Sequence, residues 1–452
     1  MRSHWGSKLG FILAAAGSAV GLGNIWRFPY LIAQNGGGAF LLIYLICVGF
    51  LGYFLLTAKM TFGRIAGTNF VHGFQKVSDN KVSCWWGRIG GFLTLFNIFF
   101  VSAVYVVVIG WTLSYVVAAG QNLVGHNPIL IDEHLFENLT SSFSMQLFWG
   151  ILCVVLAALI LLQGVKGGIE KASLYLMPLL FLLLIFMVIW IFMLPESDKG
   201  VSYLFTPNWS YLGFEPMGFN SHKFAQTVLL ALGQAIYSLS LGLGVCFIYG
   251  SYLKPETDIK KSAVCVVVLD TLVAVLASMI VVPAIFAFGL ESNQGPILSF
   301  VTLPFVFNQM VGGKVFMFIF FLLLFVAALT SLISIYEPAI NLLIERKHMG
   351  RGKAILCVAI LNLFLSVLVL ASFTGYLQWR IAGKNLFDFA DYLTGSYTMG
   401  LMVLVYCVFM GWKIWPKMTE NLNIKNKLFE NYFSFVIKLL APIIIVTLFV
   451  LA

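Results

Sequence analysis

Charged residues are scarce in this chain. Asp, Glu, Lys and Arg make up 10% of its 452 residues, whereas 60% of the residues are hydrophobic. A soluble domain carries about one quarter charged residues, so this composition excludes an ordinary soluble protein. Lys and Arg lie in short segments between apolar runs and not on one basic face, so the net charge of +9 predicts no nucleic-acid partner. The composition indicates a protein whose partner is the lipid bilayer.

Features of other protein classes are also missing. The seven cysteines are odd in number and lie within or beside apolar runs, which excludes a disulfide framework. All six histidines fall in loops or at the ends of apolar runs. The sequence has no histidine–carboxylate cluster, no nucleophile–base pair and no phosphate-binding Walker motif. We therefore expect neither an enzyme nor an ATP-driven pump.

Apolar runs long enough to cross a bilayer recur along the whole chain. A spanning helix needs about 20 residues. Eleven spans are predicted, at residues 9–36, 39–66, 85–120, 146–163, 170–194, 222–252, 259–289, 313–344, 354–372, 388–412 and 431–451. The predicted fold is an all-α integral membrane protein in which residues 1–452 form a single transmembrane domain.

Positive charge predicts the orientation of these spans. Twenty of the 27 Lys and Arg residues, with Lys59 counted among them, fall in segments that face one side of the membrane together with the N-terminus. Cytoplasmic loops carry an excess of Lys and Arg. The N-terminus is therefore predicted to be cytoplasmic, and the odd number of spans places the C-terminus outside.

Two spans carry clusters of small residues near their centres, Gly17–Asn24 in the first and Ser238–Gly244 in the sixth. Such clusters can serve close packing between helices. Paired interruptions at equivalent places instead indicate an inverted repeat with a binding site at the middle of the membrane. Half-helix N-termini offer N–H groups to a carboxylate, and freed carbonyls suit a cation. The repeats would cover about 9–194 and 222–412, with an extra helix at about 431–451.

Short stretches around these interruptions resemble a known family. Residues 19–30 read AVGLGNIWRFPY and residues 35–40 read NGGGAF. Together with residues 234–244, 327–331 and 391–395, they resemble spans 1, 6, 8 and 10 of the neurotransmitter:sodium symporters. Eleven spans and a short loop between spans 3 and 4 are similar to the bacterial amino acid branch of that family. The resemblance implies a five-plus-five inverted repeat with broken helices 1 and 6, and transport of an amino acid with sodium.

The resemblance also implies a substrate site and two sodium sites beside the breaks. The substrate site would be built by Ala19, Gly21, Leu22, Gly23, Val101, Tyr105, Tyr237, Ser238, Ser240, Leu243, Ser331 and Ile335. The first sodium site would use Ala19, Asn24, Ser238 and Asp270, and the second Gly17, Val20, Ala327, Thr330 and Ser331. A structural alternative for Thr330 and Ser331 is that their hydroxyls bond back to their own helix.

Ionisable residues inside spans are costly, so each is a candidate for function. Arg27 and Asp391 match the family's outer gate, where they are expected to form an ion pair above the substrate. Arg2, Trp5, Tyr252 and Glu345 resemble its cytoplasmic gate. Glu337 precedes Pro338 and is a candidate ligand, but we expect its carboxylate to bond the backbone that proline leaves unpaired.

Asp270 lies in the middle of an apolar run with no basic residue near it in sequence. A buried carboxylate there needs a cation or a proton. In chloride-dependent relatives a bound anion supplies negative charge near the first sodium site. Our hypothesis is that Asp270 replaces that anion, so that transport needs two sodium ions and no chloride.

These observations together predict a sodium-coupled symporter that imports hydrophobic, aliphatic or aromatic, L-amino acids by alternating access. The predicted place is the inner membrane of a bacterial cell, as a monomer or weak dimer. Two alternatives stay open. The substrate could be another small zwitterion or an amine, or the protein could be an amino acid sensor with the same fold that transports nothing.

Overall fold

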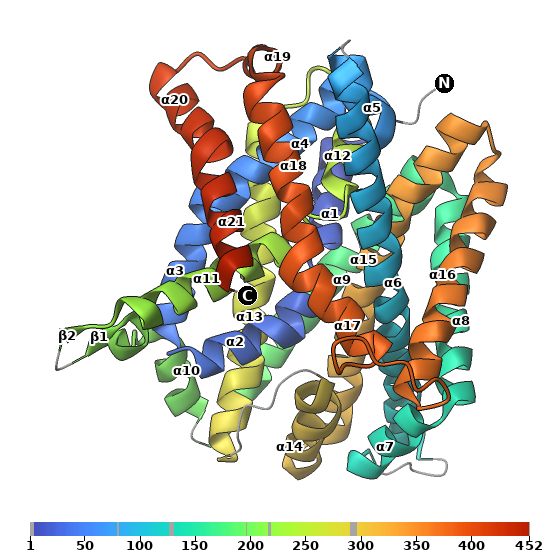
Figure 1. Cartoon of the computed structure of the whole chain (residues 1–452). Coiled ribbons are helices and arrows are strands. Elements are labelled where there is room, and N and C mark those ends of the chain that lie inside the picture. Colours follow the sequence, from blue (N-terminus) through green and yellow to red (C-terminus); the bar gives the residue numbers. More distant parts are fainter. Residues whose placement is uncertain are drawn as a thin grey trace.

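The chain forms a bundle of long helices (Figure 1). The structure is a computed structural model and describes residues 4–78, 81–125, 131–195, 197–215, 218–289 and 296–451. The spanning part of the first half consists of α1 (Lys8–Ala19), η1 (Gly23–Arg27), α2 (Phe28–Gln34), α3 (Gly38–Cys47), η2 (Val48–Gly52), α4 (Tyr53–Ala66), α6 (Lys81–Val124), α8 (Phe143–Leu162), η3 (Val165–Glu170) and α9 (Lys171–Ile191).

The second half is also built from long helices, and the last of them correspond to the predicted extra helix. Its spanning part consists of α11 (Ser221–Ser238), α12 (Val245–Ser251), α13 (Ile259–Ala287), α15 (Gly313–Lys347), α16 (Arg351–Phe373), α17 (Leu386–Leu393), η6 (Thr394–Thr398), α18 (Met399–Trp412), α20 (Lys427–Phe435), η7 (Val436–Leu440) and α21 (Ala441–Leu451). Shorter elements connect the spans: α5 (Phe70–Val77), α7 (Glu133–Ser141), α10 (Ser197–Phe205), η4 (Trp209–Leu212), η5 (Leu298–Thr302), α14 (Leu303–Gln309) and α19 (Trp415–Asn421).

The observed helices confirm the predicted fold class. Among the described residues, nine helices are long and apolar enough to cross a membrane, and a bent pair formed by α1 with η1 and α2 makes a tenth. The remaining predicted span, 222–252, corresponds to α11 and α12, which residues 239–244 separate. One small exception to the all-helical prediction is a hairpin in which β1 (Phe214–Glu215) pairs antiparallel with β2 (Gly218–Phe219).

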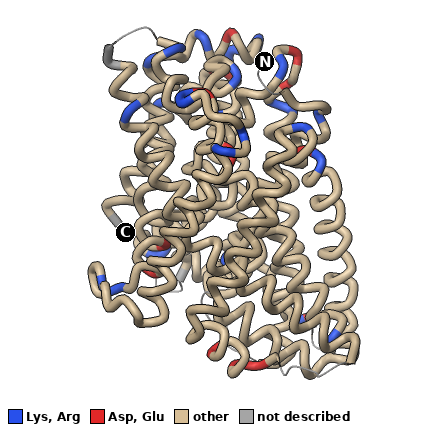
Figure 2. Tube along the Cα trace, turned by 90° about the vertical axis from the view of Figure 1, so that its right-hand side faces the viewer, with Lys and Arg blue, Asp and Glu red and all other residues tan. Residues whose placement is uncertain are grey.

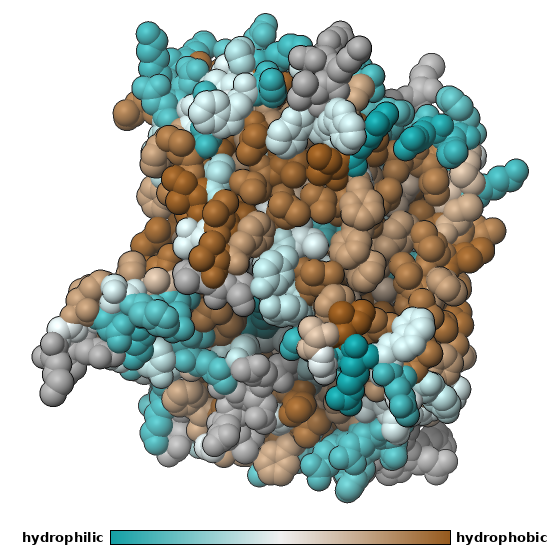
Figure 3. Space-filling view, in the orientation of Figure 1, coloured by the Kyte–Doolittle hydropathy of each residue, from teal (hydrophilic) through white to brown (hydrophobic). Residues whose placement is uncertain are grey.

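The surface shows how the bundle sits in a bilayer. Hydrophobic residues form a broad band between two polar ends (Figure 3). Most Lys and Arg lie at the end that carries the N-terminus (Figure 2). Lys59 corrects our charge count, because its side chain is fully buried in α4 and does not belong to a loop.

Close packing at the centre positions the interrupted helices. The helix α1 packs against α9, α13 and α15, and α12 packs against α4. A Cβ atom on Gly63 of α4 would lie 1.9 Å from the Phe247 carbonyl oxygen, and one on Gly250 of α12 would lie 2.2 Å from that of Met60. Only glycine allows two backbones to approach this closely. The second half of the sixth span, α12, is therefore packed closely against α4.

Candidate substrate and sodium site

The first span is interrupted where the glycine cluster predicts. The helix α1 ends at Ala19, and Val20 is extended, with φ −66° and ψ 118°. The next helical segment begins at Gly23, and the chain bends by 56° across the break. The Ser331 hydroxyl of α15 crosses to this break and donates to the carbonyls of Val20 (2.8 Å) and Gly17 (3.4 Å). Freed backbone groups are thus satisfied by a neighbouring helix.

The sixth span is interrupted between Ser238 and Val245. Ser240 and Gly244 have positive φ angles of 51° and 75° within this segment. A non-glycine residue in that conformation is strained, and such strain clusters at functional sites. The Ser240 hydroxyl donates to the Ser18 carbonyl at 3.0 Å, so the two interruptions lie against each other. Asn97 of α6 donates to the Gly242 carbonyl at 3.2 Å.

One small cavity lies where the two interruptions meet. All twelve residues of the predicted substrate site line it, together with Ser18, Asn24 and Met399. Its volume is about 30 Å³, room for little more than one water molecule. An amino acid can enter only if the surrounding side chains move.

A larger vestibule lies next to this cavity. It has a volume of about 510 Å³ and shares Leu22, Gly23, Val101, Tyr105 and Tyr237 with the small cavity. The rings of Tyr105 and Tyr237 therefore lie between the two spaces. A Cβ atom on Gly23 would lie 2.8 Å from the Tyr237 ring, so that ring rests directly on the start of η1.

Groups suited to a carboxylate converge at the start of η1. The Tyr105 hydroxyl is buried and has no hydrogen-bond partner among the described residues. A Cβ atom on Gly21 would lie 3.1 Å from this hydroxyl and 2.8 Å from the Ser331 hydroxyl. A buried hydroxyl without a partner is costly unless a ligand provides one. The beginning of a helix also offers unpaired N–H groups and positive potential.

The residues of the first predicted sodium site lie together. Ser238 donates to Asp270 at 2.7 Å, and the Asn24 amide nitrogen donates to Ser238 at 2.9 Å and to Asp270 at 2.8 Å. Asp270 and Asn24 are fully buried. Carboxylate, hydroxyl and carbonyl oxygens suit a hard cation. Asn24 differs from expectation, because its side-chain oxygen accepts the Gly21 N–H at 3.1 Å and its nitrogen faces Asp270.

The second predicted sodium site joins α1 to α15. The Ser331 hydroxyl reaches across to α1, whereas the Thr330 hydroxyl donates to the carbonyls of Ala327 (3.0 Å) and Val326 (3.2 Å) in its own helix. The structural alternative, in which a hydroxyl bonds back to its own helix, therefore holds for Thr330 but not for Ser331. The Thr330 side chain still lies beside Gly17, since a Cβ atom there would be 3.4 Å from the Thr330 Cβ.

The two residues of the predicted outer gate line the same vestibule but are not in contact. The structure contains no ion pair between Arg27 and Asp391, both of which it describes. The Arg27 guanidinium instead lies over the Tyr237 ring, 4.9 Å from its centroid. The expected ion pair is thus absent between these two described residues, and the Arg27 side chain contacts an aromatic ring in its place.

Two residues of the predicted inner gate, Trp5 and Tyr252, pack together near the N-terminus. The Trp5 indole N–H donates to the Tyr249 carbonyl at 3.0 Å, and its ring packs edge-on against those of Tyr249 and Tyr252. The Glu345 carboxylate accepts hydrogen bonds from Thr68 and from the Asn69 backbone. Arg2, the fourth predicted gate residue, lies outside the described residues.

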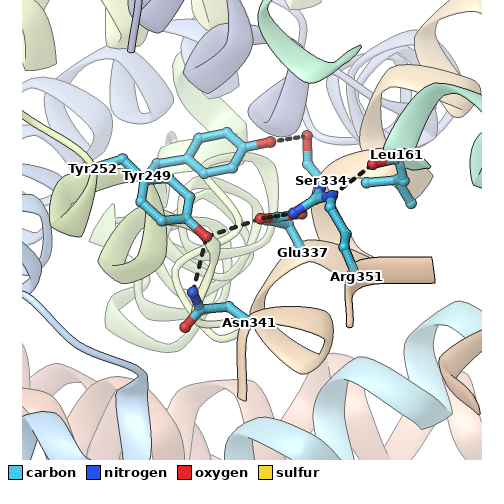
Figure 4. A network of polar contacts seen from close by, with 7 residues as sticks. All are labelled: Leu161, Tyr249, Tyr252, Ser334, Glu337, Asn341 and Arg351. Atoms are coloured by element: carbon cyan, nitrogen blue, oxygen red, sulfur yellow. Dashed lines mark hydrogen bonds and ion pairs between the residues drawn. The ribbon is translucent and has the colours of Figure 1, made fainter. Parts of the chain in front are cut away.

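Glu337 takes part in an ion pair that corrects our expectation for it. Its carboxylate accepts hydrogen bonds from Arg351 at 2.7 and 3.2 Å and from the Tyr252 hydroxyl at 2.8 Å (Figure 4). The Arg351 Nε also donates to the Leu161 carbonyl at 2.7 Å. The expected bond to the backbone beside Pro338 was wrong, because a charged partner from α16 reaches this carboxylate. One cluster thus joins α12, α15, α16 and the end of α8.

Several residues of this region were not anticipated. Ser18 and Met399 line the small cavity, and Asn97 supports the break in the sixth span. A lysine at position 59 inside an apolar run was a visible signal, since charged residues within spans are candidates for function. No pattern in the sequence connects Arg351 with Glu337, because the two lie in different helices.

Comparisons with known proteins show the family of this chain. The sodium:neurotransmitter symporter family matches residues 2–126 and 134–452. The chain belongs to this family. An uncharacterized sodium-dependent transporter of Haemophilus influenzae is 35% identical over 464 residues, covering 99% of this chain and 98% of the relative. The uncharacterized sodium-dependent transporter YhdH of Bacillus subtilis is 33% identical, covering 99% of this chain and 96% of the relative.

A solved structure of the family matches over the full length. The crystal structure of MhsT in complex with L-phenylalanine is similar with a TM-score of 0.88 and 33% identity, covering 100% of this chain and 99% of MhsT. The protein is therefore a multi-pass, sodium-dependent transporter and not an enzyme.

Proposed function

We propose that this family member is a symporter that imports hydrophobic L-amino acids together with two sodium ions. The observation that carries the proposal is the meeting of both helix interruptions at one cavity lined by all twelve expected residues. The crystallised complex of MhsT with L-phenylalanine supports a hydrophobic substrate. The cavity wall formed by Val101, Tyr105, Tyr237, Leu243 and Ile335 carries no charge, which favours an apolar side chain.

The geometry supports a division of roles within the site. The substrate carboxylate would bind at the N–H groups of Leu22 and Gly23 and at the Tyr105 hydroxyl, which lacks a protein partner. Asp270 and Ser238 would hold the first sodium ion, and Asn24 would join them if its amide turned to present oxygen. Ser331 would hold the second ion between α1 and α15.

Alternating access would arise from the two closures at opposite ends of the site. The vestibule beside Arg27 and Asp391 is open, whereas Trp5 and Tyr252 pack together on the other side of the site. This arrangement is expected of a transporter in an outward-facing state. We place the N-terminus in the cytoplasm of a bacterial cell, because Lys and Arg gather at that end. A zwitterion carries no net charge, so sodium would supply the driving force, about 2.3 kcal/mol per ion per 100 mV.

Asp270 is proposed to make transport independent of chloride. Its carboxylate lies 2.7–2.8 Å from Ser238 and Asn24 and has no basic partner among the described residues. A sodium ion bound there would have its charge balanced by the protein itself.

Uptake into proteoliposomes tests the proposal. Radiolabelled L-phenylalanine, L-leucine, glycine and a monoamine are compared under an inward sodium gradient, with chloride present or replaced by gluconate. We expect sodium-driven uptake of the two hydrophobic amino acids without chloride. Uptake of the amine or of glycine alone would favour a different substrate class, and sodium-dependent binding without uptake would favour a sensor.

Two variants distinguish a specific role of Asp270 in transport from a general loss of stability in α13. Asp270→Ser should abolish uptake or make it depend on chloride. Ser278→Ala is the matched control, because Ser278 is buried in the same helix and its hydroxyl bonds only the Ala274 carbonyl. Uptake by Asp270→Ser that matches wild type and ignores chloride would refute the proposed role.

A further inference from the structure

Lys59 is an ionisable residue within a spanning helix that the proposed transport site does not use. It lies in α4 and is fully buried. A charged side chain at such a depth is expensive and is usually paired with another charge or with backbone carbonyls. The structure contains no ion pair between Lys59 and any described carboxylate. Its partners must therefore be of another kind.

The partners of Lys59 are a backbone carbonyl and an aromatic ring. The ammonium group donates to the Leu241 carbonyl, which lies in the interruption between α11 and α12. It also lies over the Tyr406 ring of α18, 4.3 Å from the centroid. An ammonium over an aromatic face is attracted by the ring's negative potential. Both contacts stabilise positive charge at the break.

The carbonyls of this interruption are satisfied one by one from neighbouring elements. The Leu239 carbonyl faces the Cys246 thiol at 3.7 Å, the Ser240 carbonyl accepts the Leu243 N–H at 3.3 Å, and Asn97 donates to that of Gly242. Among these described hydrogen-bond donors, only Lys59 can carry a full positive charge. The end of α11 carries the negative end of a helix dipole, which favours a cation there. Without Lys59, the Leu241 carbonyl would lose its hydrogen-bond donor in a dry interior.

The segment that Lys59 contacts also builds the substrate cavity. Ser240 and Leu243 flank Leu241 and both line that cavity. The helix that carries Lys59 touches α12 backbone to backbone at Gly63 and Gly250. Lys59 is thus placed on a rigid neighbour, at a fixed distance from the interruption. A change in this contact is transmitted to the residues that surround substrate.

We propose that Lys59 is a positioning residue, a cation built into the protein that holds the sixth span in its interrupted form so that Ser240 and Leu243 face the substrate. The proposal rests on the proposed function, because it concerns the same site. It adds a positive charge carried by the protein to those of the two proposed sodium ions. Lys59 touches neither substrate nor ion, and it acts through the Leu241 carbonyl.

The test compares the variants Lys59→Met and Lys59→Arg with wild type in nanodiscs. The sodium concentration for half-maximal thermal stabilisation and the Kd for L-phenylalanine are measured for each. Loss of a charge-assisted hydrogen bond should raise both values by about tenfold or more in Lys59→Met. Lys59→Arg keeps the charge and should recover most of the affinity. Thr61→Val is the matched control, because Thr61 is buried in the same helix and its hydroxyl bonds only the Thr57 carbonyl.

A pH series adds a readout that a purely structural role would not move. Lysine can lose its proton at alkaline pH, whereas arginine keeps its charge. Binding by wild type should therefore weaken at alkaline pH more than binding by Lys59→Arg. The other titratable groups around Lys59 are Tyr406 and Cys407 of α18 and Cys246 of α12, and they are the same in both proteins.

The outcomes separate the two proposals. If wild type shows no sodium-dependent stabilisation, the proposed function fails. If wild type responds to sodium and Lys59→Met responds with the same half-maximal concentration and Kd, the inference about Lys59 is overturned. If Lys59→Met and Lys59→Arg both fail to fold while Thr61→Val folds, Lys59→Gln is measured in their place. A Kd for L-phenylalanine and a half-maximal sodium concentration equal to those of wild type in Lys59→Gln would again overturn the inference about Lys59.

Discussion

The ion pair between Glu337 and Arg351 offers a sharp test of how α15 and α16 are held together. Glu337 is fully buried, and the Arg351 side chain is 22% exposed. Two hydrogen bonds at 2.7 and 3.2 Å join them, and Tyr252 adds a third to the same carboxylate. Removing one member of a buried pair costs about 3–5 kcal/mol, because the other charge is left without compensation.

The perturbation is a double-mutant cycle with Glu337→Gln, Arg351→Gln and the double variant. Each single variant should destabilise the folded protein by about 3–5 kcal/mol. The double variant should lose less than the sum, with a coupling of about 1–3 kcal/mol between the residues. Arg351→Gln also loses the bond to the Leu161 carbonyl, so its effect should exceed that of Glu337→Gln.

The assay is thermal unfolding of purified protein followed by size-exclusion fluorescence. Lys353→Met is the matched control, since Lys353 is an exposed charge in the same helix as Arg351. It should change the midpoint little, because exposed charges contribute about 0–1 kcal/mol. Single effects that simply add in the double variant would refute the pairing, as would a Glu337→Gln midpoint equal to that of wild type.

Three further predictions concern the site itself. Gly21→Ala should abolish substrate binding, because its Cβ would lie 2.8 Å from the Ser331 hydroxyl, whereas Gly49→Ala meets nothing within 4 Å and should bind normally in the same assay. Tyr105→Phe removes a buried hydroxyl that lacks a protein partner, so without substrate its thermal stability should be equal to or higher than that of wild type. The same variant should raise the Kd for L-phenylalanine by about tenfold, and an unchanged Kd would place the carboxylate elsewhere. Ser331→Ala should raise the sodium concentration for half-maximal uptake by at least about tenfold. A sodium dependence equal to that of wild type would exclude Ser331 as a sodium ligand.

Much of the fold was predictable because membrane spans leave a strong signal. Each of the eleven predicted runs overlaps an observed helix or interrupted pair, since a bilayer demands long apolar helices with internally paired backbone. The interruptions at Gly21 and Gly242 were predictable as well, because several small residues lie together near mid-span. The β1–β2 hairpin left no such signal, since each strand is only two residues long.

The cavity residues were placed through the resemblance to the symporter family, and the structure brings them together. Contacts between helices that are distant in the sequence were harder to predict. Sequence reasoning connected Arg27 with Asp391, but the two described side chains line one vestibule without forming an ion pair. It did not connect Glu337 with Arg351 or Lys59 with Leu241, because such pairs are set by three-dimensional packing. Lys59 was counted with the loop charges although it lies inside the predicted span 39–66, and the sequence does not show that a carbonyl in the break of another helix accepts its hydrogen bond.

An experimental structure with sodium and L-phenylalanine bound measures the central claim most directly. We predict that both spans stay interrupted, at Val20–Leu22 and at residues 239–244. The substrate carboxylate should lie against the N–H groups of Leu22 and Gly23, with one cation at Asp270 and another at Ser331. Continuous helices through Gly21 and Gly242, or a substrate held only in the vestibule beside Asp391, would contradict this account.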